Sequence, residues 1–131
     1  MINSKKDFEK LVSDAYGINA DYPFKDNSAS VFRHESNKKW FAIIMTVDKS
    51  KLDKSQKGEV NIVNLKCSPE IIDSLWQEQG IYPAYHMNKS HWLSVYLDGS
   101  VDDKTIGWLL SISYDLTGKK LPKKNFNPKK Q

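Results

Sequence analysis

The chain has 131 residues, of which 39% are hydrophobic and 27% charged, so we expect one globular domain with a radius of gyration of roughly 14 Å. The single Cys67 excludes an intramolecular disulfide, and no apolar run is long enough to span a bilayer or to form the core of a secretion signal. These features predict a soluble cytoplasmic protein without membrane association. We also expect a monomer.

The net charge of +4 is concentrated at the end of the chain. Residues 119–131 hold six lysines and no acid, which leaves 14 basic and 16 acidic side chains in residues 1–118, a net charge of −2. We expect residues 1–118 to form the folded domain and residues 119–131 a disordered basic tail. The tail lysines either favour solubility or attract polyanions loosely.

The first predicted element is a helix that begins after Ser4 and ends at Gly17. Ser4 and Asp7 have the spacing of a capping box, and apolar side chains then recur at helical spacing. Five of them form one stripe: Phe8, Leu11, Val12, Ala15 and Tyr16. Such a stripe is expected to pack on a sheet.

Two strands follow, over residues 29–34 and 39–47, joined by a tight connection at residues 35–38. The second strand has apolar residues on both faces, as is typical of a central strand covered on each side. Strict alternation places Trp40, Ala42, Ile44 and Thr46 on one face and Phe41, Ile43, Met45 and Val47 on the other.

After a polar loop at residues 48–58, residues 59–67 form a third strand whose apolar period slips between Ile62 and Val63, which predicts a bulge. Ser68 and Pro69 then open a second helix that ends at Gly80. Its inward residues are Ile71, Ile72, Leu75 and Trp76.

Residues 81–90 form an aromatic turn, residues 91–97 a fourth strand, and a third helix begins near residues 100–102. The third helix has a buried stripe widened by three further residues: Ile106, Leu109, Leu110, Ser113 and Tyr114, with Trp108, Ile112 and Leu116. The order α-β-β-β-α-β-α, with short links, predicts an α+β domain with a curved antiparallel sheet backed by helices.

Several short runs carry a family resemblance. They are Tyr22-Pro23-Phe24, Val31-Phe32-Arg33, Lys39-Trp40-Phe41-Ala42, Asn64-Leu65-Lys66-Cys67, Pro83-Ala84-Tyr85-His86-Met87-Asn88-Lys89, His91-Trp92 and Ser113-Tyr114-Asp115-Leu116. In their order and spacing, these runs resemble the MmcQ/YjbR family of small bacterial proteins over roughly residues 1–120. The resemblance implies a fold similar to CyaY and frataxin. It also implies DNA binding, because members are described as DNA-binding proteins with paired β-hairpin wings.

The first functional hypothesis is therefore a nucleic-acid-binding module that is not an enzyme. Lysine and arginine suit phosphate contacts, while asparagine, arginine and histidine can reach base edges. The candidate contact residues are Arg33, Lys38, Lys39, Lys66, His86, Asn88, Lys89 and His91, supported by Tyr85 and Trp92. The alternative is that these lysines only solvate hairpin tips. A domain of net charge −2 must gather its basic residues on one face to bind nucleic acid.

A second hypothesis is a pocket near the turn at Pro83–His91 that binds a small molecule or a protein partner. A reactive form of this pocket would use Cys67 with His86, His91, Asp98 and Tyr85. However, a lone cysteine at a strand end is more often a small buried residue. We therefore expect no catalytic residues and no cofactor.

No metal site is expected either. His86 and His91 lie five residues apart across a turn, without a second cysteine that would complete a zinc site. The acidic residues of the first helix, which a frataxin-like fold would offer to iron, are interleaved with lysines. These are Asp7, Glu9 and Asp14, with Lys5, Lys6 and Lys10.

The aromatic residues Tyr82, Tyr85, Trp92 and Tyr96 have two interpretations. They either fill the space between the turn and the second helix or form a stacking platform for unpaired bases or a flat ligand. Solvent accessibility of Tyr85 and Trp92 separates the two.

Overall fold

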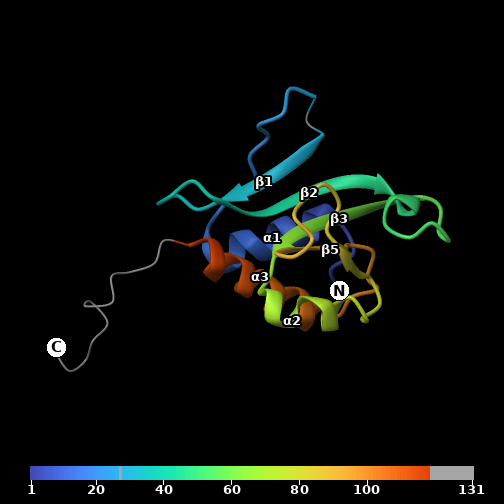
Figure 1. The fold of residues 1–131 in the computed structure, drawn as a ribbon. Helices are drawn as coiled ribbons and strands as arrows, with labels where there is room; N and C mark the ends of the chain where they lie inside the picture. Colours follow the sequence, from blue (N-terminus) through green and yellow to red (C-terminus); the bar gives the residue numbers. More distant parts are fainter. Residues whose placement is uncertain (27, 119–131) are drawn as a thin grey trace.

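The protein is described by a computed structural model over residues 1–26 and 28–118, so the predicted tail at residues 119–131 lies outside the described part (Figure 1). The elements in chain order are α1 (Lys5–Tyr16), β1 (Ala29–Arg33), β2 (Trp40–Asp48), η1 (Lys49–Lys51), β3 (Glu59–Lys66), α2 (Pro69–Leu75), β4 (Ile81–Pro83), β5 (Trp92–Tyr96) and α3 (Asp103–Thr117). The strands form one antiparallel sheet in the order β1-β2-β3-β5-β4. The three helices lie on one side of it (Figure 1). The predicted α+β class and antiparallel sheet are confirmed.

Helix α1 forms as its capping residues predict. The Ser4 hydroxyl accepts a hydrogen bond from the Asp7 backbone N–H at 3.1 Å, and Gly17 ends the helix in the left-handed region at φ 67°. Phe8 and Val12 are fully buried against the sheet. Ala15 is exposed, contrary to prediction, because the buried stripe is narrower than the apolar pattern.

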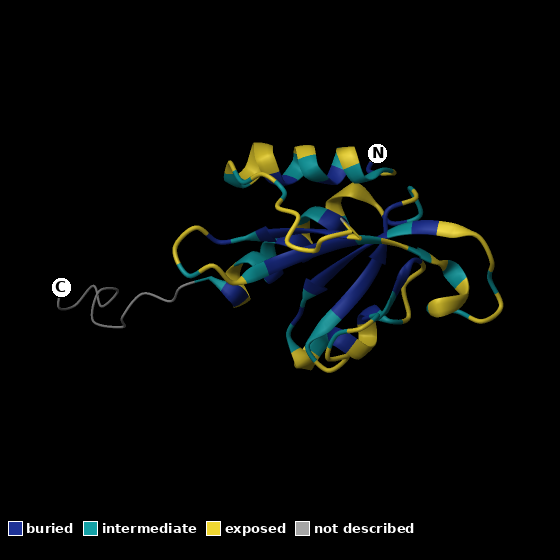
Figure 2. Ribbon diagram, turned by 90° about the horizontal axis from the view of Figure 1, so that it is seen from above, coloured by how far each residue is buried: buried dark blue, intermediate teal, exposed yellow. Residues whose placement is uncertain are grey.

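The main core fills the space between the sheet and the helices. Strand residues such as Ile44, Val63 and Leu65 meet helix residues such as Ile106 and Leu109, and all five are at most 1% exposed. Burial follows the strands, while exposed residues lie along the outer sides of the helices and in the loops (Figure 2). Each such side chain contributes roughly 1.5–3 kcal/mol of burial free energy, so this layer supplies most of the stability.

Strand β2 contains a bulge that simple alternation did not predict. Phe32 pairs with Ala42, but Arg33 pairs with Trp40, so Phe41 has no partner in β1. Phe41 and Ala42 therefore both face the helices in the main core, whereas Trp40 joins Ile43 on the opposite face. The predicted face assignment was wrong for residues 40 and 41.

The bulge predicted in residues 59–67 is absent from β3. Val63 and Leu65 face the helices, and Ile62 faces the other side, where it is also fully buried. The apparent slip between Ile62 and Val63 arises because this central strand is covered on both faces.

Residues 81–83, predicted as part of a turn, form the short edge strand β4. Ile81 pairs with Val95 and Pro83 with Leu93. A proline has no N–H to donate, so its position in an edge strand costs no ladder hydrogen bond. The strand is too short for a periodic pattern to reveal it.

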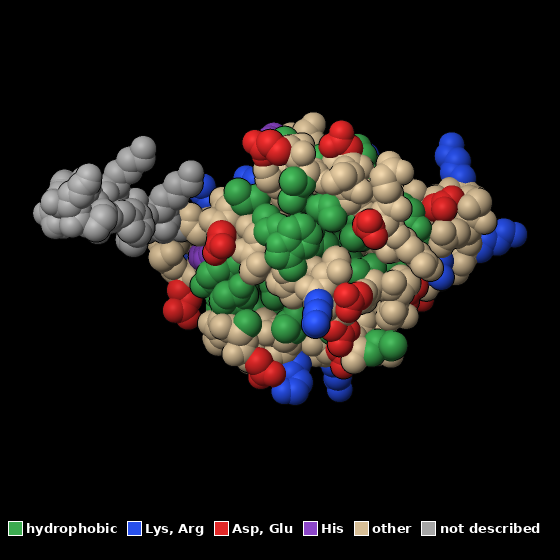
Figure 3. Space-filling model, turned by 90° about the horizontal axis from the view of Figure 1, so that it is seen from below, with side chains coloured by type: hydrophobic (Ala, Val, Ile, Leu, Met, Phe, Trp, Pro, Cys, Tyr) green, Lys and Arg blue, Asp and Glu red, His purple; other side chains and the backbone are tan. Residues whose placement is uncertain are grey.

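The second and third helices depart from prediction at their ends and outer sides. Helix α2 ends at Leu75 rather than near Gly80. In α3, Trp108 and Leu116 are 49% and 41% exposed, although the pattern placed them in the buried stripe. They lie on the helical side of the molecule, where apolar side chains gather at the surface among acidic ones (Figure 3).

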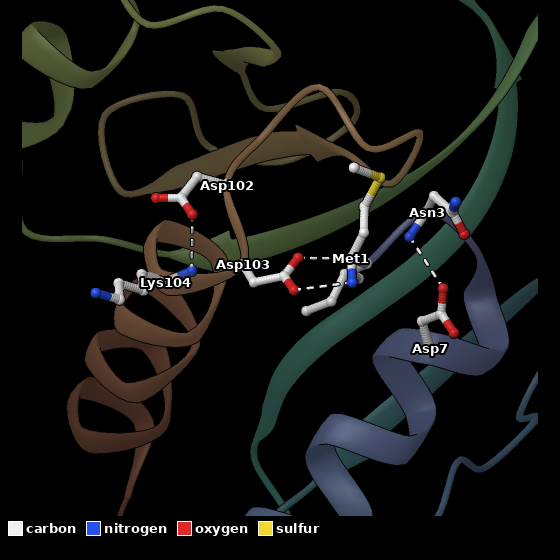
Figure 4. Close-up of polar contacts among 7 residues, drawn as sticks. Met1, Asn3, Asp7, Asp102, Asp103 and Lys104 are labelled. Atoms are coloured by element: carbon white, nitrogen blue, oxygen red, sulfur yellow. Dashed lines mark hydrogen bonds and ion pairs between the residues drawn. The ribbon is translucent and has the colours of Figure 1, made fainter.

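The start of the chain is bonded to the first turn of α3. Asp103 accepts a hydrogen bond from the Ile2 backbone N–H at 2.7 Å and pairs with the Met1 amine at 3.1 Å (Figure 4). The Ile2 bond, followed by the amine, lowers the pKa of Asp103. These contacts join the segment before α1 to the helix that follows β5.

His34, after β1, is buried between Phe41 and Tyr114, and its Nε2 lies 2.8 Å from the Thr117 hydroxyl. Burial lowers the pKa of His34 below its ordinary value of 6.5. The unfolded chain therefore binds a proton at a higher pH than the folded protein does. The stability that neutral His34 contributes is present above about pH 6.5 and decreases as the pH falls through that value.

We expect the free energy of unfolding to fall from pH 7.5 to pH 5.5, with this residue contributing at most about 1.4 kcal/mol per pH unit. Urea unfolding of the native protein and of His34→Gln measures the effect, because His86 and His91 are present in both proteins. An equal pH slope in the two proteins would contradict the assignment.

Candidate nucleic-acid interface

The helix-free face of the sheet carries two small apolar clusters. One contains Ala29, Val31 and Ile43, against which Trp40, Met45, Met87 and Trp92 pack. The other contains Val60, Ile62 and Tyr96, packed by residues that include Leu52, Tyr82 and Tyr85. None of the helices α1, α2 and α3 covers this face, which is shielded by the loop at residues 49–58, including η1, and by residues 84–91. We call residues 84–91 the covering turn.

The covering turn is held by two fully buried polar side chains in the middle of the sheet. Asn64 Nδ2 donates to the Tyr85 carbonyl at 3.0 Å, and the Tyr85 N–H donates to Ser94 Oγ at 2.9 Å. Ser94 Oγ donates to Asn64 Oδ1 at 2.5 Å, which links the two strands beneath the turn. Both backbone polar groups of Tyr85 are therefore satisfied by β3 and β5, and the next residue, His86, has a left-handed φ of 60°.

Beside the covering turn lies a half-open cavity of about 490 Å³. Its walls are mainly apolar, from Phe24, Trp40, Ile43, Met45 and Met87, with Tyr85 and His86 at the turn. No Lys, Arg, Asp or Glu is among its lining residues in the described part of the chain. The cavity is in the size range of small-molecule sites, roughly 300–1,000 Å³.

Most of the predicted contact residues come together around this turn. Lys66 is the pairing partner of Trp92, and both face the helix-free side. The His91 carbonyl accepts from the Cys67 N–H at 2.8 Å, which places His91 beside the end of β3. The exposed members of the group are His86, Asn88 and Lys89. The Asn88 carbonyl accepts the N–H groups of His91 and Trp92, so the turn closes on itself.

The predicted residues of the first hairpin form a separate group. Arg33 is ion-paired with Asp21 and, with Lys38, lines a polar hollow at the β1 edge of the sheet. Lys38 and Lys39 are exposed, and Lys38 has a left-handed φ of 64°. Trp40 is the link between the groups, since it pairs with Arg33 and lines the cavity beside the covering turn.

Charge is distributed unevenly along the domain. Residues 29–67, which contain the first three strands, have eight basic and four acidic side chains, whereas residues 68–118 have two basic and seven acidic. The net charges of these segments are +4 and −5, with −1 in residues 1–28. The net charge of −2 therefore conceals a basic first half of the sheet and an acidic segment that includes α2 and α3.

The aromatic residues in and beside the covering turn do not pack on α2. The interpretation that they fill the space between the turn and the second helix was therefore wrong. Tyr82, Tyr85 and Tyr96 belong to the cluster that contains Val60 and Ile62, and Trp92 belongs to the cluster that contains Val31 and Ile43. Helix α2 packs in the main core, on the opposite face of the sheet. Alternation along β4 and β5 sends Tyr82, Trp92 and Tyr96 to the helix-free side. Tyr85 and Trp92 are half-buried there.

Cys67 is buried at 1% exposure, and this burial raises the pKa of its thiol. A reactive thiol requires the opposite, an accessible sulfur with a lowered pKa.

Among residues 1–26 and 28–118, no three His, Cys, Asp or Glu side chains are grouped so that they could hold a metal ion. In the same part of the chain, no helix has the length and hydropathy needed to cross a membrane.

We expect a thiol reagent such as 5,5′-dithiobis(2-nitrobenzoate) to label native Cys67 at least about a hundredfold more slowly than the unfolded chain, because access requires an opening of several kcal/mol. The absorbance of the released thiolate, in buffer and in denaturant, measures the two rates. Similar rates in both conditions would show an accessible thiol.

Sequence reasoning missed the residues that build this face. The candidate residues did not include Trp40, Met45 and Met87. The bulge in β2 reverses the face on which Trp40 lies, and the covering turn, which contains Met87, has no periodic pattern. A usable signal existed for Asn64 and Ser94, which are single polar residues inside apolar strand runs. A buried polar side chain in such a position must have hydrogen-bond partners.

Comparisons with known proteins identify the family. The family model described as YjbR matches residues 6–116. The chain is similar to the uncharacterized protein YyaQ of Bacillus subtilis (strain 168), with 43% identity over 116 residues, 87% of this chain and 98% of YyaQ. It is also similar to the uncharacterized protein YjbR of Escherichia coli (strain K12), with 44% identity over 61 residues, 46% of this chain and 52% of that protein.

Solved structures agree with these sequence matches. The crystal structure of a Pseudomonas syringae protein has a TM-score of 0.84 and 36% identity, covering 88% of this chain and 99% of that one. The crystal structure of a Deinococcus radiodurans protein has a TM-score of 0.68 and 31% identity, covering 91% and 81%. From the family match and these similarities, the chain belongs to the YjbR family.

Proposed function

We propose that this protein is a non-enzymatic, cytoplasmic nucleic-acid-binding module that uses the helix-free face of a frataxin-like sheet. The observation that carries the proposal is the gathering of Trp40 and Trp92 against one cluster, beside Lys66 and the exposed covering turn. Tryptophan faces can stack on bases, and lysine and histidine side chains bind phosphates.

The uneven charge also supports the proposal. Binding to a polyanion is driven largely by counterion release, which needs a local group of cations rather than a positive total. Lys66 pairs with Trp92, and Lys89 belongs to the covering turn three residues before it. Lys38 and Lys39 add cations at the first hairpin. Arg33 contributes less, because Asp21 already neutralises it.

The test is fluorescence anisotropy of labelled single-stranded and duplex DNA with the full chain and with a chain that ends at Gly118. If about four phosphates are contacted, raising the salt from 50 to 200 mM weakens binding by roughly a hundredfold. The double variant Lys66→Glu/Lys89→Glu is expected to weaken binding at low salt by at least about tenfold.

The matched control is Lys6→Glu/Lys104→Glu, which makes the same change in net charge on exposed positions of α1 and α3. We expect this control to change the affinity less than about threefold, because its charges lie on the helical side and are screened. Equal losses in the two double variants, or binding that disappears with residues 119–131, would refute a site on the helix-free face.

A further inference from the structure

The cavity beside the covering turn is the strongest feature that general phosphate binding does not explain. It opens on the helix-free face, and its walls include the flat side chains of Trp40 and Tyr85 and the polarizable side chains of Met45 and Met87. Such walls favour a planar, uncharged group that presents a π face. With no Lys or Arg among its described lining residues, the cavity lacks a permanent cation for a phosphate or a carboxylate.

Hydrogen-bonding groups occur at the cavity, and they are all neutral or weakly basic. The side chains of Ser28 and His86 are the polar ones to consider among the residues that line it. These side chains offer donors and acceptors to the polar edge of a planar ligand. A nucleobase has this combination of an apolar face and a polar edge.

The backbone near this cavity is held in a demanding conformation. His86 has a left-handed φ of 60°, which is uncommon for a non-glycine residue, and Tyr85 before it is fixed on both sides by Asn64 and Ser94. Strained residues that the surrounding structure holds in place are concentrated at binding sites. Of Lys38 and His86, the two described non-glycine residues with a left-handed φ, His86 lines the cavity.

The surroundings of the cavity supply the cations that its walls lack. Trp40 lines the cavity and follows the two exposed lysines of the first hairpin, while the covering turn continues from the cavity to Lys89. A nucleotide whose base enters the cavity would have its phosphate outside, within the region of these basic residues.

We propose that this cavity binds one unstacked nucleobase of a single strand. This inference rests on the nucleic-acid-binding function proposed above. A base in a duplex has its faces covered by stacking and its edge by pairing, so it must first be extruded at a free-energy cost. The protein therefore prefers single strands to duplexes, and its affinity depends on the presence of bases. The choice between DNA and RNA depends on contacts to the 2′-hydroxyl.

Binding of four labelled probes of equal length to the full chain tests this inference. The probes are single-stranded DNA, single-stranded RNA, the same DNA backbone with abasic sites, and a DNA duplex. Low-salt anisotropy is expected to show at least roughly tenfold tighter binding of the base-containing single strands than of the abasic strand or the duplex. Free nucleosides, measured by calorimetry, are expected to bind far more weakly than the strands, because they lack phosphates.

The variant Ser28→Phe adds a ring at an exposed residue that lines the cavity, and Ser13→Phe adds the same ring at an exposed residue of α1. Ser28→Phe is expected to remove the preference for bases and to leave binding of the abasic strand unchanged. Ser13→Phe is expected to retain the preference. A strand with one photoreactive 4-thiothymidine gives a second measurement in the unmodified protein, with crosslinks expected at Trp40, Tyr85 or Met87.

The outcomes distinguish the two proposals. Equal affinity for intact and abasic strands, or crosslinks only outside the cavity, overturns the base site but retains nucleic-acid binding. Absence of binding to every strand at low salt overturns both proposals. Saturable binding of a free nucleoside without binding of any strand also overturns both, and assigns the cavity to a free base-containing molecule.

Discussion

Asn64→Ala is expected to destabilise the protein by about 2–4 kcal/mol, because it leaves the Tyr85 carbonyl without its side-chain donor and the Ser94 O–H without an acceptor in a buried position. Asn64 is fully buried and makes hydrogen bonds to both groups. For a domain of this size, the loss corresponds to a fall in Tm of roughly 10 °C. Thermal unfolding followed by circular dichroism measures it.

The same variant is expected to release the covering turn more than the rest of the fold. Amide hydrogen exchange of residues 84–91 should become faster, while exchange in β2 and β3 changes less. The matched control is Asn61→Ala on the same strand, whose side-chain oxygen accepts a hydrogen bond from the exposed Thr46 hydroxyl at 2.6 Å. If Asn64→Ala and Asn61→Ala have the same Tm and the same exchange in the turn, Asn64 does not hold the turn.

Phe41→Ala is expected to cost about 3–5 kcal/mol, the usual range for removing a large aromatic side chain from a core. Phe41 is fully buried, with ring centroids of His34 and Tyr114 each 5.0 Å away and that of Tyr16 at 6.1 Å. The truncation leaves a cavity at the point where α1, α3 and the bulge of β2 meet. Chemical denaturation of the two proteins gives the difference.

Phe24→Ala removes the same ring from a residue that is 40% exposed and lines the cavity on the helix-free face. Its effect on the free energy of unfolding is expected to be less than about 1 kcal/mol. A loss for Phe41→Ala that is no larger than the loss for Phe24→Ala would show that the bulge does not bury residue 41.

The sequence predicted the elements that have strong local signals. Helix α1 has a capping serine and a terminal glycine that operate as expected, and its apolar stripe faces the core except at Ala15. Strands β1 to β3 were correctly placed as consecutive antiparallel neighbours, because their apolar runs are separated by clear turn residues. The family resemblance was also correct.

The candidate site was predicted less completely, because it depends on long-range packing. Lys66 and His91 do lie near each other, since the strand order brings the end of β3 beside the start of β5. The direction taken by the covering turn depends on Asn64 and Ser94, which lie 30 residues apart in sequence. No local pattern shows that these two residues bind the same backbone segment, so the cavity could not be predicted.

The bulge at Phe41 also decides which aromatic side chain of the first hairpin reaches a ligand. Side chains in a strand alternate between faces, so a regular strand of the same sequence would place Trp40 on the core face of Ala42 and Phe41 on the helix-free face. The composition of the chain would not change, yet the two aromatics would exchange faces. Deleting Phe41 would instead leave Trp40 directly before Ala42 and still on the helix-free face, so among proteins with this hairpin the pairing register before Ala42, more than the presence of an aromatic residue, separates those that can present it to a ligand.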